Sequence, residues 1–159
     1  MRGHNAWQPH VRYDKPASPV EALCDRMLIR RVLANLVENA VQAAEGAGRV
    51  PEVVLHVEAE RGGDDDRGRI DIVVDDNGPG VPASARERIF DPYVTTKENG
   101  TGLGLAIVRK IVIDHGGDVV VAAEPSPLGG ARFTVAIPAA SPAAAAGPAP
   151  AAPAPATSP

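Results

Sequence analysis

The chain has 159 residues, which is enough for one ordinary domain whose core needs neither disulfides nor a metal. A formal net charge of −4, with acidic and basic residues interspersed, and an aromatic content of 3% predict no nucleic-acid partner. Cys24 is the only cysteine, and no secretion signal opens the sequence. No apolar run approaches the roughly 20 residues that cross a bilayer. We therefore expect a cytoplasmic protein without direct membrane contact.

Composition divides the chain into three parts. Residues 1–10 show no periodicity and predict an unstructured arm. Residues 139–159 are almost entirely Ala and Pro, with no charge and no large apolar group, and predict a disordered tail. The part between them, residues 11–138, has the length of a typical domain.

The first half of this domain predicts a short strand, a long helix and a hairpin. The strand is the brief "VRY" near the start, and the helix ends at Gly46 and Gly48. The segments "EVVLHVEAE" and "RIDIVVDD" alternate apolar and polar residues, which is typical of two antiparallel strands. The apolar residues that recur at helical spacing are Leu23, Met27, Leu28, Val32, Leu36, Val37, Ala40, Val41 and Ala44.

The second half predicts a short helix, a longer helix and a second hairpin. "PASARERIF" opens on Pro82, a residue suited to a first helical turn. A helix from Leu103 to His115 ends at Gly116–Gly117, and "DVVVAA" and "ARFTVAIP" follow as strands. Paired strands and separate helices favour an α+β two-layer sandwich, with a mixed, mostly antiparallel sheet of about five strands covered on one face by three helices.

The first helix carries a pair of amides in "NLVENA". Asn35 and Asn39 are four residues apart and therefore share one face of the helix. Their carbonyl oxygens are ligands that suit Mg²⁺, but each amide could equally cap a neighbouring backbone group, and the pair alone leaves both interpretations open. The nearest carboxylate, Glu38, is expected to be a solvated acid paired with Arg30 or Arg31.

The segment "DDNGPGVP" has the composition of a turn directly after a strand. Gly78 and Gly80 allow a tight turn and a close approach of the backbone to a flat ligand. An ordinary turn explains these residues as well as a binding site does. The position of Asp76 at the end of the strand favours binding, because a carboxylate there can accept a hydrogen bond from the exocyclic amine of an adenine.

A polar, glycine-rich loop precedes the last helix. The spacing of its glycines does not match the G-x-G-x-x-G pattern of dinucleotide sites. The helix begins among the glycines, so free backbone N–H groups and the positive end of the helix face the loop, which favours an anion site over a mobile linker. The loop residues concerned are Thr95, Thr96, Lys97, Gly100, Gly102 and Gly104.

These blocks, in this order, closely resemble the ATP-binding catalytic domain of sensor histidine kinases, in the superfamily that includes DNA gyrase B, the MutL mismatch-repair protein and a heat-shock chaperone. "NLVENA" resembles the N box, "DNGPG" the G1 box, "IFDPYVTTK" the F box and "GTGLGL" the G2 box. Gly129–Gly130 resemble the last glycine motif. Four blocks in this order are specific, and the resemblance covers essentially the whole domain.

The resemblance implies a Bergerat-type sandwich with ATP under a mobile lid. Asn39 would ligate Mg²⁺, Asn35 would assist at the metal or the phosphates, and Asp76 would bind the adenine amine. Lys97, like Asn35, is a candidate for assisting at the phosphates, and Phe90 with Thr95 to Lys97 would belong to the lid. The remaining residues that the resemblance places around ATP are Gly78, Gly80, Gly100, Thr101, Gly102, Leu103, Gly104 and Leu105.

Two positions refine the resemblance. Many family members carry a lysine where this chain has Gln42, and the nitrogen-regulation-type sensors, which share "PYVTTK", also lack it. The ATP-hydrolysing branches of the superfamily carry a glutamate where this chain has Asn35, and an amide cannot act as a base. The resemblance therefore implies phosphoryl transfer to a protein rather than ATP hydrolysis.

The implied partners are a phosphoacceptor histidine domain and, through it, a response regulator. Nothing before Val11 is long or periodic enough to be a helical phosphoacceptor hairpin, and His115 is expected to cap its helix. We therefore expect the chain alone to be a monomer that binds Mg–ATP without autophosphorylation, either by itself or as the cytoplasmic part of a membrane-bound sensor. The alternative is a nucleotide-responsive module that sequesters a partner, or a serine kinase of the anti-sigma-factor type.

Overall fold

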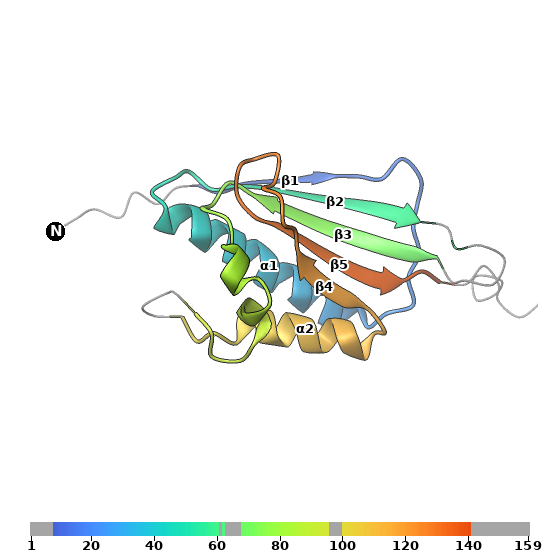
Figure 1. The fold of residues 1–159 in the computed structure, drawn as a ribbon. Helices are drawn as coiled ribbons and strands as arrows, with labels where there is room; N and C mark the ends of the chain where they lie inside the picture. Colours follow the sequence, from blue (N-terminus) through green and yellow to red (C-terminus); the bar gives the residue numbers. More distant parts are fainter. Residues whose placement is uncertain (1–7, 61, 63–67, 96–99, 141–159) are drawn as a thin grey trace, which may run out of the picture.

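A five-stranded sheet forms one layer of the molecule, and two α-helices lie against one of its faces (Figure 1). The structure is a computed structural model that describes residues 8–60, 62, 68–95 and 100–140. The strands are β1 (His10–Asp14), β2 (Glu52–Glu60), β3 (Arg69–Asp76), β4 (Asp118–Val121) and β5 (Arg132–Pro138). Their order across the sheet is β1-β2-β3-β5-β4. Only β1 and β2 run parallel among these neighbours, which confirms the predicted mixed, mostly antiparallel sheet.

The helices are α1 (Arg26–Gly46) and α2 (Gly104–Asp114), close to the predicted bounds. Helix α1 begins at its N-cap residue Asp25, whose Oδ1 accepts hydrogen bonds from the backbone N–H groups of Met27 (2.8 Å) and Leu28 (3.0 Å). In the described part of the chain, no helix combines the length and the apolar character needed to span a membrane.

The predicted apolar stripe of α1 is wrong at its beginning. Leu23 precedes the helix and is 86% exposed, and Met27, in its first turn, is 71% exposed. Farther along, Val32, Leu36 and Ala40 are buried as their spacing predicts. Ile29, in the same turn as Met27, packs against the core. Met27 is exposed because it shares its side of the helix with the exposed Arg30, Arg31 and Ala34.

The prediction of a third helix is also wrong. Residues 82–90 form two short 3₁₀ segments, η1 (Ala83–Ala85) and η2 (Arg88–Phe90). The stretch between Pro82 and Pro92 is too short to offset the cost of nucleating an α-helix, and a residue before proline, here Asp91, disfavours helical backbone angles. Two α-helices and two 3₁₀ segments thus take the place of the three helices expected.

The hydrophobic core lies between the sheet and the helices. Strand β5 alternates as predicted, with Phe133, Val135 and Ile137 buried. Helix α2 contributes Val108 and Val112, both completely buried. The two layers are therefore held together by continuous apolar packing along the length of the helices.

His115 connects the ends of the two helices. It is the C-cap residue of α2, and its Nδ1 lies 2.7 Å from the carbonyl oxygen of Ile111, which confirms the predicted capping role. Its Nε2 accepts a hydrogen bond from the backbone N–H of Asp25 (3.0 Å). The end of α2 and the beginning of α1 are therefore fixed to each other by one imidazole ring.

We predict that Leu36→Ala and Met27→Ala, two truncations in one helix, differ sharply in their effect on folding. Leu36 is 1% exposed, so its truncation leaves a cavity and should lower the free energy of unfolding by about 2–5 kcal/mol. Met27→Ala should change it by less than about 0.5 kcal/mol, because the side chain is exposed. Urea denaturation measures both. Equal losses would contradict the burial pattern of α1.

Candidate functional site

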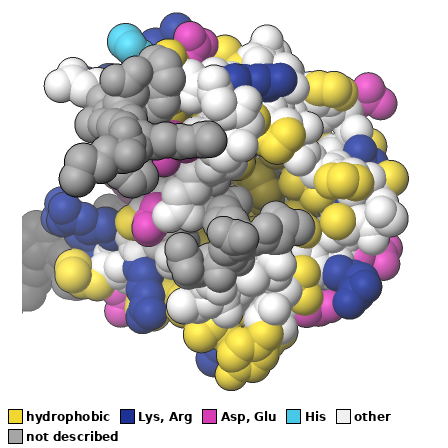
Figure 2. Space-filling view, turned by 90° about the vertical axis from the view of Figure 1, so that its left-hand side faces the viewer, with side chains coloured by type: hydrophobic (Ala, Val, Ile, Leu, Met, Phe, Trp, Pro, Cys, Tyr) yellow, Lys and Arg dark blue, Asp and Glu magenta, His cyan; other side chains and the backbone are white. Residues whose placement is uncertain are grey.

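The G1 box and the G2 box both approach helix α1, which carries the N box. A Cβ placed on Gly104, the first residue of α2, would lie 3.5 Å from Oδ1 of Asn35 on α1. A Cβ placed on Gly78, just after β3, would lie 3.1 Å from Cβ of Ala43 on α1. Figure 2 shows this end of the molecule, where hydrophobic side chains form the floor of a hollow. The G2 box therefore approaches the N box itself, and the G1 box approaches α1 three residues after the N box.

Asp76 is the polar centre of this region. Its side chain is only 2% exposed, although it follows the apolar run of β3 at the end of the strand. Oδ1 accepts hydrogen bonds from the backbone N–H groups of Gly78 (2.8 Å) and Ala131 (3.0 Å). Oδ2 accepts none from a described residue and is not among the enclosed atoms without a partner. One carboxylate oxygen is thus fixed by the backbone, and the other is left open to a ligand.

Burial raises the pKa of Asp76 above its ordinary value. Desolvation is the main cause, and the neighbouring Asp75 adds to it by charge repulsion. The hydrogen bonds from Ala131 and Gly78 favour the charged form and oppose the shift. A carboxylate that is costly to ionise and still has an open oxygen is typical of a binding residue.

The turn after Asp76 is fixed to the beginning of β2. Gly80 adopts a positive φ of 80°, which a side chain would disfavour. Arg49 Nη1 donates hydrogen bonds to the carbonyl oxygens of Asn77 (2.7 Å) and Gly78 (2.8 Å). The Asn77 amide accepts from the backbone N–H of Glu52 (3.0 Å) and donates to the carbonyl oxygen of Val50 (2.8 Å). Sequence reasoning missed Arg49, because nothing in its neighbourhood signals a contact 28 residues away.

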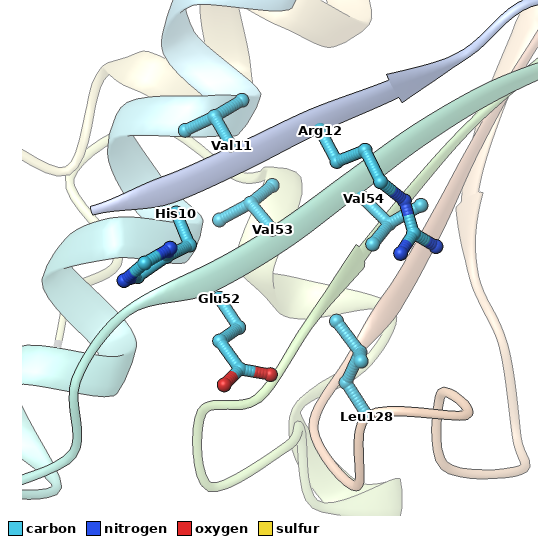
Figure 3. A pocket seen from close by; sticks show the side chains of 7 residues that line it. All are labelled: His10, Val11, Arg12, Glu52, Val53, Val54 and Leu128. Atoms are coloured by element: carbon cyan, nitrogen blue, oxygen red, sulfur yellow. The ribbon is translucent and has the colours of Figure 1, made fainter.

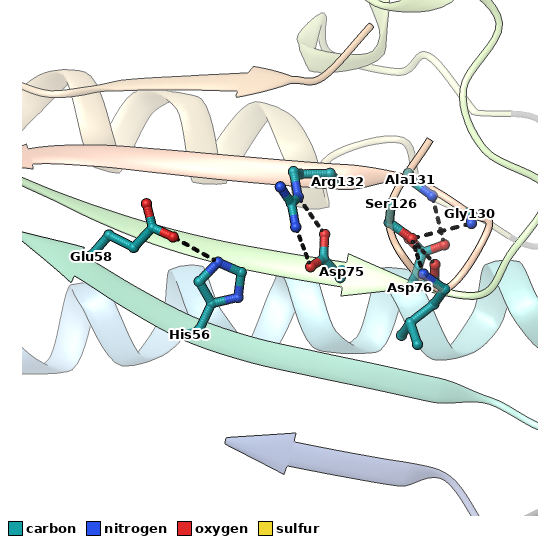
Figure 4. Close-up of polar contacts among 9 residues, drawn as sticks. His56, Glu58, Asp75, Asp76, Ser126, Gly130, Ala131 and Arg132 are labelled. Carbon is teal, nitrogen blue, oxygen red and sulfur yellow. Dashed lines mark hydrogen bonds and ion pairs between the residues drawn. The ribbon is translucent and has the colours of Figure 1, made fainter. Parts of the chain in front are cut away.

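The loop between β4 and β5 covers Asp76 from the other side. Gly130 N–H donates to the backbone carbonyl of Asp76 (3.0 Å), and Ser126 Oγ donates to the same oxygen (2.6 Å) (Figure 4). A Cβ on Gly130 would overlap Oδ1 of Asp76, so no side chain fits there. The motif that Gly129–Gly130 resemble therefore has a steric basis at its second glycine. Sequence reasoning missed Ser126, which its turn-forming neighbours gave no reason to single out.

A backbone hydrogen bond joins Tyr93 to Gly102, just before α2. Tyr93 N–H donates to the carbonyl oxygen of Gly102 (2.9 Å), and Gly102 has a positive φ of 65°. A Cβ on Gly102 would lie 2.6 Å from the carbonyl carbon of Tyr93, so glycine is required there on both grounds. Thr96 and Lys97, two of the predicted phosphate and lid residues, lie outside the described residues.

The beginning of α2 offers uncapped backbone donors. Its N-cap residue, Leu103, makes no side-chain capping hydrogen bond. Thr101 Oγ1 instead accepts from the N–H of Leu103 (3.4 Å), before the helix starts. The first N–H groups of α2 therefore point out of the helix beside Asn35, in the arrangement that suits an anion.

The residues predicted to surround ATP differ in their burial. Phe90, expected in the lid, is buried in the core, where its ring packs edge-to-face on Phe133 with centroids 6.3 Å apart. The reason is that an aromatic ring next to the apolar inner face of β5 gains more from burial than from exposure. Leu105 packs partly against the same core, whereas Thr95 and Gly100 are exposed on either side of the undescribed residues.

On α1, Asn35 and Asn39 are both half-buried, as residues at the edge of the apolar stripe should be. Glu38 lies between them and is exposed. It accepts a hydrogen bond from Gln42 Nε2 (3.1 Å), and the ion pair predicted with Arg30 or Arg31 is absent from the described part of the chain. Gln42, four residues later on the same face of the helix, is the hydrogen-bond partner of Glu38 instead.

Two further hollows border the region without including Asn35, Asn39 or Asp76. One, of about 460 Å³, lies between the turn after β3 and the β4–β5 loop and is lined by Gly80, Arg86 and Gly130 among others. The other, of about 360 Å³, is lined by the beginnings of β1 and β2 and by Leu128 from the β4–β5 loop (Figure 3). Leu128 thus lines the same hollow as residues of β1 and β2.

The outer face of the sheet carries ion pairs. Arg132 on β5 forms two hydrogen bonds with the buried carboxylate of Asp75 on β3, at 2.7 and 2.8 Å, and His56 on β2 lies 3.4 Å from Glu58 (Figure 4). Sequence reasoning did not pair Asp75 with Arg132. The pair joins the two strands that flank the Asp76 region, so it supports the site without facing it.

Comparison with known proteins agrees with this architecture. Residues 24–141 match the family model described as "Histidine kinase-, DNA gyrase B-, and HSP90-like ATPase". The chain is similar to the nitrogen regulation protein NtrY of Azorhizobium caulinodans, with 42% identity over 121 residues, which are 70% of this chain and 14% of that protein. The chain therefore spans only a small part of this relative.

Solved structures are similar as well. The ATP-binding domain of PrrB from Mycobacterium tuberculosis has a TM-score of 0.62 and 30% identity, with 84% of each chain covered. Full-length ShkA in complex with AMPPNP has a TM-score of 0.68 and 35% identity, with 82% of this chain and 26% of that chain covered. From its motifs, its sandwich and these relatives, the chain belongs to the histidine kinase-, DNA gyrase B- and HSP90-like ATPase family, as an ATP-binding catalytic domain of the sensor histidine kinase type.

Proposed function

We propose that the chain binds Mg–ATP and supplies the γ-phosphoryl group to a histidine on a separate dimerisation and phosphoacceptor domain, which in turn serves a response regulator. The observation that carries the proposal is the buried Asp76 carboxylate, with Oδ1 bound to two backbone N–H groups and Oδ2 open. The chain would carry out this function in the cytoplasm through its domain of residues 11–138, either by itself or as a part of a membrane-bound sensor.

Adenine selection follows from the open oxygen of Asp76. The exocyclic amine of adenine donates to Oδ2, and the turn at Gly78 and Gly80 brings the backbone close to the flat base. A base with a carbonyl oxygen in that position would face the carboxylate without a proton between them. Such a mismatch in a desolvated site discriminates strongly between substrates.

Phosphate and metal binding follow from the facing ends of α1 and α2. The uncapped N–H groups at the beginning of α2, with Gly100, Gly102 and Gly104, receive the phosphates. The half-buried carboxamides fit a hard cation, because amide oxygens are ligands of Mg²⁺: Asn39 would hold it, with Asn35 and Lys97 assisting at the phosphates. When bound, the metal neutralises charge on the phosphate oxygens.

The transfer itself needs little from this chain beyond position and charge. A histidine nitrogen of the partner attacks the γ-phosphorus, the bond between that phosphorus and the β–γ bridging oxygen breaks, and ADP leaves with the electron pair. An amide at position 35 cannot activate water, which supports transfer to a protein over hydrolysis. The likeness to nitrogen regulation protein NtrY supports the same direction.

We predict that Asn39→Ala weakens ATP binding mainly when Mg²⁺ is present. The affinity of the unchanged protein for ATP should rise with added Mg²⁺. In the variant this rise should be at least about tenfold smaller, since one ligand of the cation is missing. Isothermal titration with and without Mg²⁺ measures the effect. Glu45→Ala, an exposed change on the same helix, is the control. An equal gain from Mg²⁺ in Asn39→Ala would contradict the metal assignment.

We also predict that the chain alone does not become phosphorylated on histidine. Both ring nitrogens of His115 are engaged, and His56 pairs with Glu58 on the outer face of the sheet, away from the helix layer. With γ-labelled ATP, label should appear only after a phosphoacceptor hairpin of a sensor kinase is added, and it should be acid-labile and on that hairpin. Mass spectrometry locates it. Phosphohistidine on this chain, or acid-stable phosphoserine on a partner, would contradict the proposal.

A further inference from the structure

We infer that Ser126 is a positioning residue that sets the orientation of the Asp76 carboxylate and thereby the selectivity for adenine. The inference rests on the proposed binding of ATP by Asp76 and names a residue that no sequence block contains. Ser126 lies in the β4–β5 loop, 50 residues after Asp76, and is 5% exposed. Its hydroxyl is bonded within the protein, so its effect on binding is expected to pass through its neighbours.

The hydroxyl of Ser126 is fully used. It donates to the backbone carbonyl of Asp76 at 2.6 Å and accepts from the N–H groups of Leu128 and Gly130, both at 3.2 Å. The backbone of Ser126 also pairs with the loop, because its N–H donates to the carbonyl of Gly130 and its carbonyl accepts from the N–H of Gly129, each at 2.9 Å. The hydroxyl therefore closes the loop upon itself and ties it to the end of β3.

This closure determines which donors reach the carboxylate. Gly130 N–H is directed to the backbone carbonyl of Asp76, and the next N–H, that of Ala131, is directed to Oδ1. The backbone N–H of Asp76 in turn donates to the carbonyl of Ala131 at 3.0 Å. If the loop shifts, the hydrogen bond from Ala131 lengthens and Oδ1 keeps only the one from Gly78. The carboxylate can then rotate, and Oδ2 loses its fixed direction.

The close contact at Gly130 gives this arrangement little freedom. A Cβ there would lie 2.5 Å from both the Asp76 carbonyl oxygen and the Gly78 nitrogen, so the loop backbone already lies against both. On the far side, Leu128 contributes to the hollow at the beginnings of β1 and β2 (Figure 3). The Ser126 hydroxyl provides the side-chain hydrogen bond between this loop and the Asp76 backbone, beside the backbone hydrogen bonds of Gly130 and Ala131.

The test is the ratio of two dissociation constants, for inosine triphosphate and for ATP, each measured with Mg²⁺ by titration calorimetry. Inosine triphosphate has the same size but a carbonyl oxygen in place of the amine. For the unchanged protein the ratio should be about 10 to 100, as expected for a hydrogen bond to a charged group. Ser126→Ala should lower this ratio at least threefold, chiefly by weakening ATP binding, and Ser126→Thr, which keeps the hydroxyl, should preserve it.

The ratio of the two dissociation constants does not depend on the fraction of folded protein, so it can be measured even for a variant that is partly unfolded. Ser84→Ala, a change in an exposed serine of η1, is the control and should leave the ratio unchanged. If Ser126→Ala weakens both nucleotides equally, or if Ser126→Thr loses the ratio as Ser126→Ala does, the positioning role is overturned. Asp76→Ala separates the two claims: a ratio near one in this variant and a high ratio in Ser126→Ala would retain the adenine role of Asp76 and reject that of Ser126.

Discussion

The hydrogen bonds that hold Asp76 Oδ1 are the constraint around which the end of the sheet is built. A carboxylate that is almost completely buried requires donors, and the chain supplies two from its backbone, Gly78 and Ala131. Neither donor is available unless the chain turns sharply after β3 and the β4–β5 loop lies directly on that turn. The glycines of both segments are required by this approach, since a Cβ on Gly130 would overlap Oδ1 and one on Gly78 would lie 3.0 Å from it.

The rest of the fold keeps these segments in register. Strand β5 pairs antiparallel with β3, and the Asp75–Arg132 ion pair joins them on the outer face next to Asp76. Arg49 fixes the turn from the side of β2. On the inner face, the beginning of α2 lies next to Asn35 of α1, and the turn after Asp76 lies next to Ala43 of the same helix. The surroundings of Asp76 thus draw on both layers of the molecule.

The features that could be predicted from the sequence are those with a local signature. The alternation of β5, the spacing of α1 and the glycines before α2 predict a strand and two helices that agree with the structure, whereas the phosphate role of the loop before α2 stays a prediction. Resemblance to a family then groups Asn39, Asp76 and the loop into one site. The exposed position of Met27 escaped prediction because its apolar side chain was assigned to the buried stripe, although it lies on the side of α1 that carries the exposed Arg30 and Arg31.

Contacts between distant segments left no such signature. Ser126 and Arg49 reach Asp76 and its turn across 50 and 28 residues, and both are common residue types in unremarkable loops. The 3₁₀ segments near Phe90 escaped for a different reason, since a few residues with helical composition do not reveal whether an α-helix can complete its turns. What the sequence lacks is thus the tertiary support of the site rather than its ligand-facing groups.

Asp76→Asn tests most directly whether Asp76 is kept for binding at a cost to stability. Since the pKa of Asp76 is raised in the folded state, its ionisation lowers the free energy of unfolding as the pH rises from the unfolded pKa through the folded one. An amide keeps an oxygen for Gly78 and Ala131 and carries no charge. At pH 8 the variant should therefore unfold at the same temperature as the unchanged protein or higher, while its affinity for Mg–ATP falls at least about tenfold. A variant that is less stable but binds ATP equally well would contradict the account.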